Sequence, residues 1–260
     1  MKIDMHCHSK EGSIDAKVGI LDYAKKLKKE GFDGMLITDH NSYQGYRTYR
    51  DASLKAKREL GDFRVFKGIE YDTRNGGHIL VILPEGIKSR LVEIRGMAVE
   101  MLIETVHSLG GILGPAHPYG TGYFAIMHTN IIKKQEELLD KFDFVEVFNA
   151  YASPTANIDA RKLAERLGKP GTAGSDAHHF LMVGTTGTIF SREIHNNNEL
   201  IRAVLDNAIT DAGSLIEIVR SKTNFVLKEL GIAGYWVYNK LGSVLSFKAR
   251  RREYKKHRMK

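Results

Sequence analysis

Short β-type segments alternate with helical patterns along most of this chain, and this alternation constrains its fold more than any other feature. The expected strands cover residues 3–8, 35–40, 65–70, 78–83, 112–117, 144–148, 170–178 and 185–190. The expected helices between them cover residues 21–31, 46–60, 89–109, 131–142 and 156–167. Repeated strand–helix units predict an α/β fold with a mainly parallel sheet. About seven units in about 210 residues favour a closed or distorted barrel, with an open doubly wound sheet as the alternative.

The pattern changes beyond Ala212. Residues 215–230 are expected to form one helix, and residues 232–247 a second apolar segment that contains Trp236. A basic tail ends the sequence. We therefore expect two parts, a catalytic barrel over residues 1–213 and a helical extension over residues 214–260.

The net charge of +8 is concentrated in this tail. Lys248–Lys260 contains eight basic residues and one acid, so this segment carries +7 and the other 247 residues together carry +1. Such a tail has two interpretations, which the sequence leaves open. It is a solvated, frayed C-terminus, or it contacts nucleic acid or an anionic surface.

Cysteine content and hydropathy indicate where in the cell the protein is expected. Cys7 is the only cysteine, which excludes an intramolecular disulfide and favours a reducing environment. The uncharged residues 105–132 contain seven glycines and prolines, so no transmembrane segment is expected there. Met1 and Lys2 lead directly into a strand without a signal peptide. A cytoplasmic protein is expected.

Histidines and carboxylates gather at the ends of the expected strands. His6 and His8, two apart on one strand, point to the same side roughly 7 Å apart, so they can bind one ion. The other candidates at strand ends are His40, Glu70, His78, His117, Asp176 and His178. His78 is the exception, because it lies at the amino end of its expected strand while the others lie at carboxyl ends. Active sites of barrels lie at the carboxyl ends of the strands, and buried carboxylates need a cation, so a multi-metal site is predicted.

Five segments in this order resemble the motifs of the PHP (polymerase and histidinol phosphatase) family: Asp4–His8, Ile37–His40, Gly68–Glu70, Ala116–Pro118 and Gly174–His178. The resemblance extends from the first strand to about residue 210. It implies a distorted (β/α)7 barrel that holds two or three divalent ions, usually Zn, Mn or Fe, and hydrolyses phosphate esters.

The resemblance also implies which residues hold each ion. The first ion would be held by His6, His8, Glu70 and Asp176. Glu70 would bridge to a second ion held by His78 and His117. A third ion would be held by His40, His178 and a residue of the loop after the first strand. Among these ligands, Glu70, Asp176 and His178 are the expected catalytic residues.

The loop after the first strand departs from the family's simplest pattern, because Ser13 stands where the family often has Asp. Asp15 lies 25 residues before His40, a separation that resembles the family's pattern, and it is the expected ligand. Glu11, followed by Gly12, is the alternative.

Mixed imidazole and carboxylate ligands suit Zn, Mn or Fe. A water held between two ions loses a proton near neutral pH, and the metal-bound hydroxide attacks phosphorus without a protein nucleophile. Cys7 faces away from the ligands by strand alternation. Expected substrate contacts on strand-end loops are Lys10, Arg47, Tyr119 and Asn149. Asp4 and Asp39 either orient ligand imidazoles or cap turns, and Glu146 points into the barrel in a structural role.

The expected function is a metal-dependent phosphatase acting on a small phosphomonoester or nucleotide. The basic tail makes an exonuclease or other nucleic-acid phosphoesterase the first alternative. A second alternative is a metal-stabilised nucleic-acid-binding module without catalysis, although such a module would not need these costly buried charges. Metal-dependent amide hydrolysis is a third.

Overall fold

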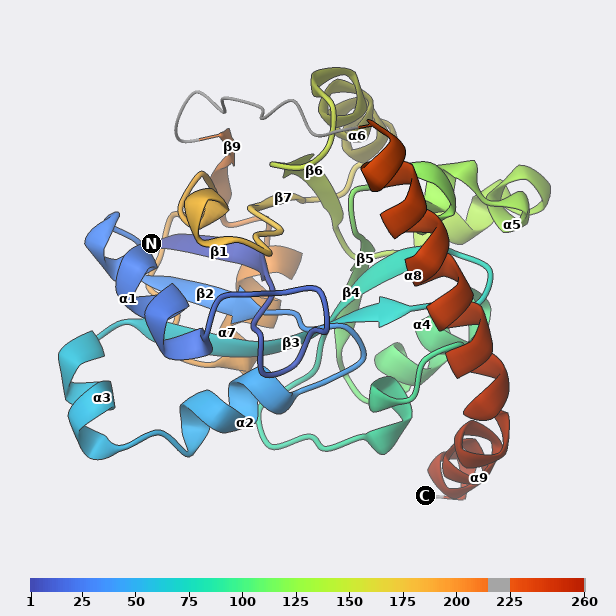
Figure 1. The fold of residues 1–260 in the computed structure, drawn as a ribbon. Helices are drawn as coiled ribbons and strands as arrows, with labels where there is room; N and C mark the ends of the chain where they lie inside the picture. The colour runs from blue at the N-terminus through green and yellow to red at the C-terminus, as the bar shows by residue number, and fades with distance from the viewer. Residues whose placement is uncertain (215–224, 260) are drawn as a thin grey trace.

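Two β-sheets form the centre of the fold (Figure 1). The structure, a computed structural model, describes the backbone of residues 1–214 and 225–259 and the side chains of residues 1–213 and 233–259. The larger sheet has the strand order β5-β4-β3-β2-β1-β8-β9, and the smaller one pairs β6 with β7. The strands are β1 (Lys2–Cys7), β2 (Gly34–Ile37), β3 (Arg64–Asp72), β4 (His78–Ile82), β5 (Ile112–Pro115), β6 (Val145–Asn149), β7 (Gly171–Gly174), β8 (Thr186–Phe190) and β9 (Ile209–Ser214).

The β6–β7 pair connects the two sides of the curled large sheet. Asp143, just before β6, exchanges backbone and side-chain hydrogen bonds with Leu113 of β5. On the other side, Cys7 at the end of β1 forms a parallel bridge with Ala177 after β7. The result is the distorted barrel that the sequence predicts, with a helical extension at its C-terminal end.

Strand direction differs from the prediction of a mainly parallel sheet. β1, β2 and β3 are parallel, as are β6 and β7, but β4 is antiparallel to both β3 and β5, and β8 is antiparallel to β1 and β9. Only residues 73–77 connect β3 to β4, and a parallel crossover needs a dozen or more residues. These five residues allow only a hairpin, in which the Thr73 backbone N–H donates to the Gly77 carbonyl.

Helices cover the outside of the sheets (Figure 1). They are α1 (Ile20–Lys29), α2 (Gln44–Arg50), α3 (Leu54–Leu60), α4 (Val99–Ser108), α5 (Asn130–Lys134), α6 (Pro154–Leu167) and α7 (Asn197–Leu205). Three of the expected helices are shorter or divided. Residues 46–60 form α2 and α3, because Ser53 begins a new helix and its hydroxyl accepts from the Ala56 N–H. Residues 89–109 contain a break at Gly96, whose φ of +87° is left-handed, and residues 131–142 divide into α5 and a 3₁₀ turn.

The C-terminal extension contains α8 (Phe225–Leu245) and α9 (Phe247–Arg258). Of the helix expected over residues 215–230, residues 215–224 lie outside the described part, and α8 continues through Gly231 into the second expected segment. The basic tail is mostly the helix α9. Arg250 on α9 is only 8% exposed and donates to the backbone carbonyls of Arg95 and Ser243. The extension therefore packs against the barrel at the Gly96 segment.

Within the described residues, every helix is too short or too polar to cross a membrane.

Candidate metal centre

All nine expected metal ligands lie at one end of the barrel. Each of the strands β1, β2, β3, β4, β5 and β7 places at least one of them there, at or just beyond a strand end. Most are buried, and their nitrogen and oxygen atoms form overlapping groups within 4.8 Å of one another. The ninth, Asp15, reaches the cluster from the loop between β1 and α1.

The first group consists of His6, His8, Glu70 and Asp176, all buried. The Nε2 atoms of the two histidines lie 3.1 Å apart. His8 Nε2 is 3.2 Å from Glu70 Oε2 and 3.1 Å from Asp176 Oδ1. Four ligand atoms thus face a common point, which is how a single cation is held.

The second group consists of Glu70, His78 and His117. Glu70 Oε1 is 3.0 Å from His78 Nδ1 and 3.0 Å from His117 Nε2. The other oxygen of Glu70 faces His6 and His8, so one carboxylate connects the two groups. His78 joins them because β4 runs antiparallel to β3: its first residue pairs with Asp72, the last residue of β3. Strand direction thus explains why a residue that begins its strand lies among residues that end theirs.

The third group consists of His8, His40 and His178, and Asp15 approaches it from the loop. Asp15 Oδ2 lies 3.6 Å from His40 Nε2 and 3.3 Å from His178 Nε2. The ring of His8 stacks between them, with centroids 4.7 Å from His40 and 4.4 Å from His178. Glu11 instead accepts from the Ile20 backbone N–H at the start of α1. Of the two loop acids, only Asp15 faces the cluster.

Hydrogen bonds hold four of the imidazoles so that Nε2 faces inward. The Nδ1 atoms lie against Glu146 for His6 (2.9 Å), Ser13 for His8 (3.1 Å), Asp72 for His40 (3.0 Å) and the Asp176 carbonyl for His178 (2.7 Å). A proton on Nδ1 leaves a lone pair on Nε2, the form in which histidine binds a metal. Glu146, expected only to be structural, thus contacts the outer side of His6.

Asp4 and Asp39 contact backbone and hydroxyl groups beside the expected ligands and not the imidazole rings themselves. Asp39 accepts from Ser13, whose hydroxyl also contacts His8. Asp4 accepts from the Ser175 hydroxyl and backbone N–H, which joins β1 to the segment before Asp176. Burial raises the pKa of Asp4 to about 6, against the hydrogen bonds from Ser175 that lower it. Asp4 therefore fixes the segment beside His6, and Asp39 fixes Ser13.

Asp72 is a site residue that the sequence analysis omits. It is buried, lies 3.0 Å from His40 Nδ1 and 3.4 Å from His78 Nε2, and accepts from the Asn41 amide. Its spacing in the sequence indicates this position. Asp72 follows Glu70 by two residues on β3, the same spacing that singles out His6 and His8.

Backbone conformation at the site is strained. His117 and Asp176 have φ values of +29° and +53°, although neither is glycine. Residues that are not glycine adopt this region rarely, and such residues gather at functional sites. Gly174 permits the close approach of β7 to β1, because a Cβ there would lie 2.6 Å from the His6 backbone nitrogen.

The ionisable groups of the cluster stabilise one another's charged forms. Burial alone would raise the pKa of the Glu70 carboxyl, but the imidazoles of His78, His6 and His40 hold that pKa well below its usual range. Burial would lower the pKa of His8, but Asp176 and Glu70 raise it to about 10. The cluster therefore favours positive charge between its carboxylates, whether as protons on imidazole or as a divalent cation.

A cleft of about 440 Å³ opens over the cluster. It is lined by Asp15, His40, Glu70, His78, His117, Gly120, Thr121, Phe124, Asn149, Tyr151, Ala152, Asp176, His178 and Tyr235. Among these lining residues there is no lysine or arginine. Tyr235 comes from α8, so the extension contributes to the cleft, a contact that the sequence analysis does not anticipate.

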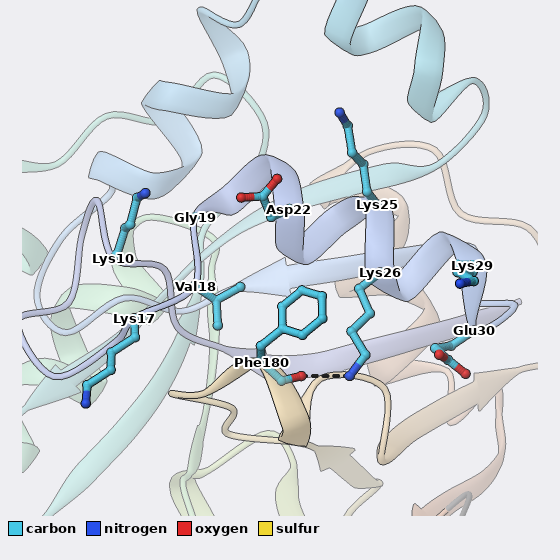
Figure 2. Close-up of a pocket in the computed structure, with 10 residues that line it drawn as sticks. All are labelled: Lys10, Lys17, Val18, Gly19, Asp22, Lys25, Lys26, Lys29, Glu30 and Phe180. Atoms are coloured by element: carbon cyan, nitrogen blue, oxygen red, sulfur yellow. Dashed lines mark hydrogen bonds between the residues drawn. The ribbon is translucent and has the colours of Figure 1, made fainter.

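Of the four expected substrate contacts, Asn149 lies in this cleft, and its amide donates to Asp176 Oδ2 and Glu146 Oε2. Arg47 forms an ion pair with Glu93 at 2.7 Å. Tyr119 packs at the edge of a hydrophobic core cluster. Lys10 lies in a separate groove of about 530 Å³ beside α1, together with four other lysines (Figure 2).

The residues present fit divalent metal ions. The donor set is imidazole and carboxylate, which suits Zn, Mn or Fe. Two of its buried atoms, Asp15 Oδ1 and His78 Nε2, have no hydrogen-bond partner among the described residues. Buried polar atoms are rarely left unpaired, and a coordinated cation would satisfy such atoms.

Comparisons with known proteins agree with the fold. A family model described as PHP-associated matches residues 154–209. The chain is 30% identical over 161 residues to an uncharacterized protein, MJ1587, of Methanocaldococcus jannaschii, which covers 58% of this chain and 83% of that protein.

Solved structures of lower sequence identity share the fold of this chain. A candidate metal-dependent phosphoesterase from Bifidobacterium adolescentis superimposes with a TM-score of 0.55 at 15% identity, over 79% of this chain and 96% of that chain. PsfC from Pseudomonas syringae superimposes with a TM-score of 0.56 at 19% identity, over 92% of this chain and 97% of that chain. At these identities the likeness concerns the fold.

Proposed function

Because this chain belongs to the PHP family, we propose that it is a metal-dependent phosphoesterase that hydrolyses a small phosphomonoester or nucleotide. The observation that carries this proposal is the position of Glu70. This buried carboxylate directs one oxygen to His6 and His8 and the other to His78 and His117. A bridging carboxylate between two ligand groups is the arrangement of two-metal phosphoryl hydrolysis.

In this proposal the barrel of residues 1–213 holds two or three ions, of zinc, manganese or iron. His6, His8, Glu70 and Asp176 hold the first ion, and Glu70 with His78 and His117 holds the second. Asp15, His40 and His178 hold the third. Bound there, such ions would supply Lewis-acid stabilisation of the phosphoryl oxygens and lower the pKa of a bound water.

The chain's own residues position the reacting groups. Glu70, Asp176 and His178 are the proposed catalytic residues. His178 donates from Nδ1 to the Asp176 carbonyl, which holds its Nε2 toward the cleft. The Asn149 amide holds the Asp176 carboxylate from the other side. The size of the cleft suits a small ligand, since ligand sites usually measure about 300–1,000 Å³.

A nucleic-acid phosphoesterase is the second candidate, and the groove beside α1 favours it. Lys10, Lys17, Lys25, Lys26 and Lys29 line that groove (Figure 2). The backbone N–H of Lys17 donates to the His178 carbonyl, so the groove begins next to the cluster. Five lysines against two acids, Asp22 and Glu30, give the groove an excess of positive charge that suits a phosphodiester backbone. The basic tail is a further proposed contact with nucleic acid or an anionic surface.

The test is hydrolysis of a phosphoester panel by chelated protein reloaded separately with Mn²⁺, Zn²⁺ or Fe²⁺. The panel includes histidinol phosphate, nucleoside monophosphates, glycerol phosphate and single-stranded oligonucleotides. Phosphate release that requires a metal and is lost in Glu70→Gln supports the proposal. Glu165→Gln, at an exposed position on α6, is the matched control.

The panel also separates the candidates. Turnover of oligonucleotides alone would replace the phosphatase with the nuclease. Metal-dependent binding of nucleic acid without turnover of any substrate would point to the binding module without catalysis.

A further inference from the structure

Tyr235 brings the C-terminal extension into the candidate active site. Its ring centroid lies 5.2 Å from that of His40, 6.2 Å from that of His78 and 5.6 Å from that of Phe124. Its hydroxyl oxygen is buried and has no hydrogen-bond partner in the described part of the chain. An unpaired buried hydroxyl is unfavourable, so a group bound in the cleft is the natural partner.

The neighbours of this hydroxyl indicate what the partner is. Two other buried atoms of the lining residues lack a hydrogen-bond partner within the described part of the chain, Asp15 Oδ1 and His78 Nε2, and both are of the kind that binds a cation. A neutral tyrosine is different, because it offers a proton. The described residues that line the cleft include no lysine or arginine to contact a bound phosphate.

We propose that the Tyr235 hydroxyl donates a hydrogen bond to a phosphoryl oxygen of the bound phosphomonoester. The extension then supplies the substrate contact that lysine or arginine supplies in other phosphate sites. This inference rests on the proposed phosphoesterase function. It makes Tyr235 of α8 part of the active site, so the extension is more than a cover for the barrel.

The test is the dissociation constant of inorganic phosphate, measured by titration calorimetry on full-length protein loaded with Mn²⁺. Tyr235→Phe keeps the ring and removes the hydroxyl, so phosphate should bind about tenfold more weakly or worse. Tyr238→Phe is the control, because its hydroxyl contacts Arg95 outside the cleft. The manganese content should be the same in all three proteins.

The outcomes separate this inference from the function on which it rests. If the parent protein neither binds phosphate nor hydrolyses any phosphoester, the proposed function is wrong. If the parent binds phosphate and Tyr235→Phe binds it equally well, the role of Tyr235 is wrong. Loss of manganese in Tyr235→Phe would also overturn it, since the hydroxyl would then be needed for the metal.

A second observation concerns the outer face of α8 and is independent of hydrolysis. Val237, Leu241, Val244 and Leu245 are 46%, 59%, 73% and 83% exposed. Their spacing places them on one face of the helix. An exposed apolar stripe of this kind marks an interaction surface.

The helix that follows, α9, adds exposed positive charge to this apolar face. Phe247 continues the apolar surface at 53% exposure. The exposed basic residues of α9 are Lys248, Arg251, Arg252, Lys255, Lys256 and Arg258. An apolar stripe joined to a dense cluster of positive charge suits an anionic lipid surface.

We infer that the outer face of α8 and the exposed side of α9 bind the surface of an anionic lipid bilayer. The contact is interfacial, since in the part of the chain that the structure describes no helix is long and apolar enough to cross a membrane. A second copy of the chain fits less well, because a symmetric interface would bring two strongly basic helices together. Nucleic acid fits less well, because four of the five apolar residues of this surface are aliphatic and only Phe247 offers bases a ring to stack on.

Co-sedimentation with lipid vesicles tests this contact. Full-length protein should bind phosphatidylserine-containing vesicles at least about tenfold more tightly than phosphatidylcholine vesicles, and salt should weaken the binding. Leu241→Ser with Leu245→Ser should reduce binding at least about fivefold. Ile158→Ser, an exposed apolar residue on α6, should leave it unchanged.

Three results would overturn the inference. Equal binding to neutral and anionic vesicles would remove the role of the basic helix. Unchanged binding of the double leucine variant would remove the role of the α8 face. A dimer in solution that the double variant dissociates would assign this face to a second copy of the chain.

Discussion

Glu146 Oε1 lies 2.9 Å from Nδ1 of His6, on the side of the imidazole opposite the Nε2 atom that faces Glu70. The other oxygen of Glu146 accepts from the His117 backbone N–H and the Asn149 amide. One carboxylate thus holds two proposed metal ligands and a residue of the cleft. Removal of its charge should loosen all three.

We therefore expect Glu146→Gln to lower metal affinity and phosphate release by about 10- to 100-fold, the usual effect of losing a hydrogen-bond partner of a ligand. Competition with a chromogenic chelator measures the affinity. Glu165→Gln, exposed on α6, is the control. Unchanged metal affinity in Glu146→Gln would mean that the charge of Glu146 does not position the ligands.

The bridging position of Glu70 predicts a difference in metal content. Glu70→Gln should lose ions from two sites, because its oxygens face both ligand groups. His178→Ala should lose one, because its Nε2 faces Asp15. Elemental analysis after metal reconstitution measures the ions per chain. Equal losses in the two variants would contradict the ligand assignment.

Cys7 should be dispensable for hydrolysis. It is fully buried on the face of β1 away from the ligands, and burial raises the pKa of its thiol well above the usual value. We expect Cys7→Ser to keep its activity within about twofold, while exhaustive chelation should abolish it. Phosphate release that is lost in Cys7→Ser, or that survives chelation, would indicate a protein nucleophile.

Arg250 should stabilise the packing of the extension. Its guanidinium is nearly buried and donates to the carbonyls of Arg95 and Ser243. Arg250→Ala should lower the free energy of unfolding by about 2 kcal/mol and Tm by about 4–8 °C. Arg251→Ala, an exposed neighbour, should change Tm little. Equal effects in a thermal melt would mean that the buried contacts do not stabilise the fold.

The metal-free protein should lose stability as the pH rises. Asp176 and Glu70, acting against burial, raise the pKa of His8 to about 10, compared with about 6.5 for an unfolded histidine. The protonated imidazole then contributes stability that is complete below about pH 6.5 and lost as the pH rises through about 10. Tm of chelated protein should therefore fall over this range.

Metal ions should reverse this trend, because they bind the neutral imidazole. In the same melts, protein loaded with Mn²⁺ should keep its Tm as the pH rises to about 9. A constant or rising Tm in the chelated protein would contradict the electrostatic coupling within the cluster.

The sequence by itself determined which histidines and carboxylates lie at strand ends. Alternation along a strand is a local property, so His6 and His8 could be placed on one side without knowledge of the fold, and Cys7 on the other. The same spacing on β3 would have added Asp72 to Glu70. The order of motifs then predicted the barrel.

Only the tertiary structure decided the direction of β4, which places His78 in the cluster, and the route of α8, which places Tyr235 there. Both depend on contacts between residues far apart in the chain. Asp15 and Glu11 are likewise equivalent by residue type, and they differ only because the folded loop directs one carboxylate to His178 and the other to the start of α1. Local patterns set what each segment can offer, and long-range packing sets which of these side chains meet.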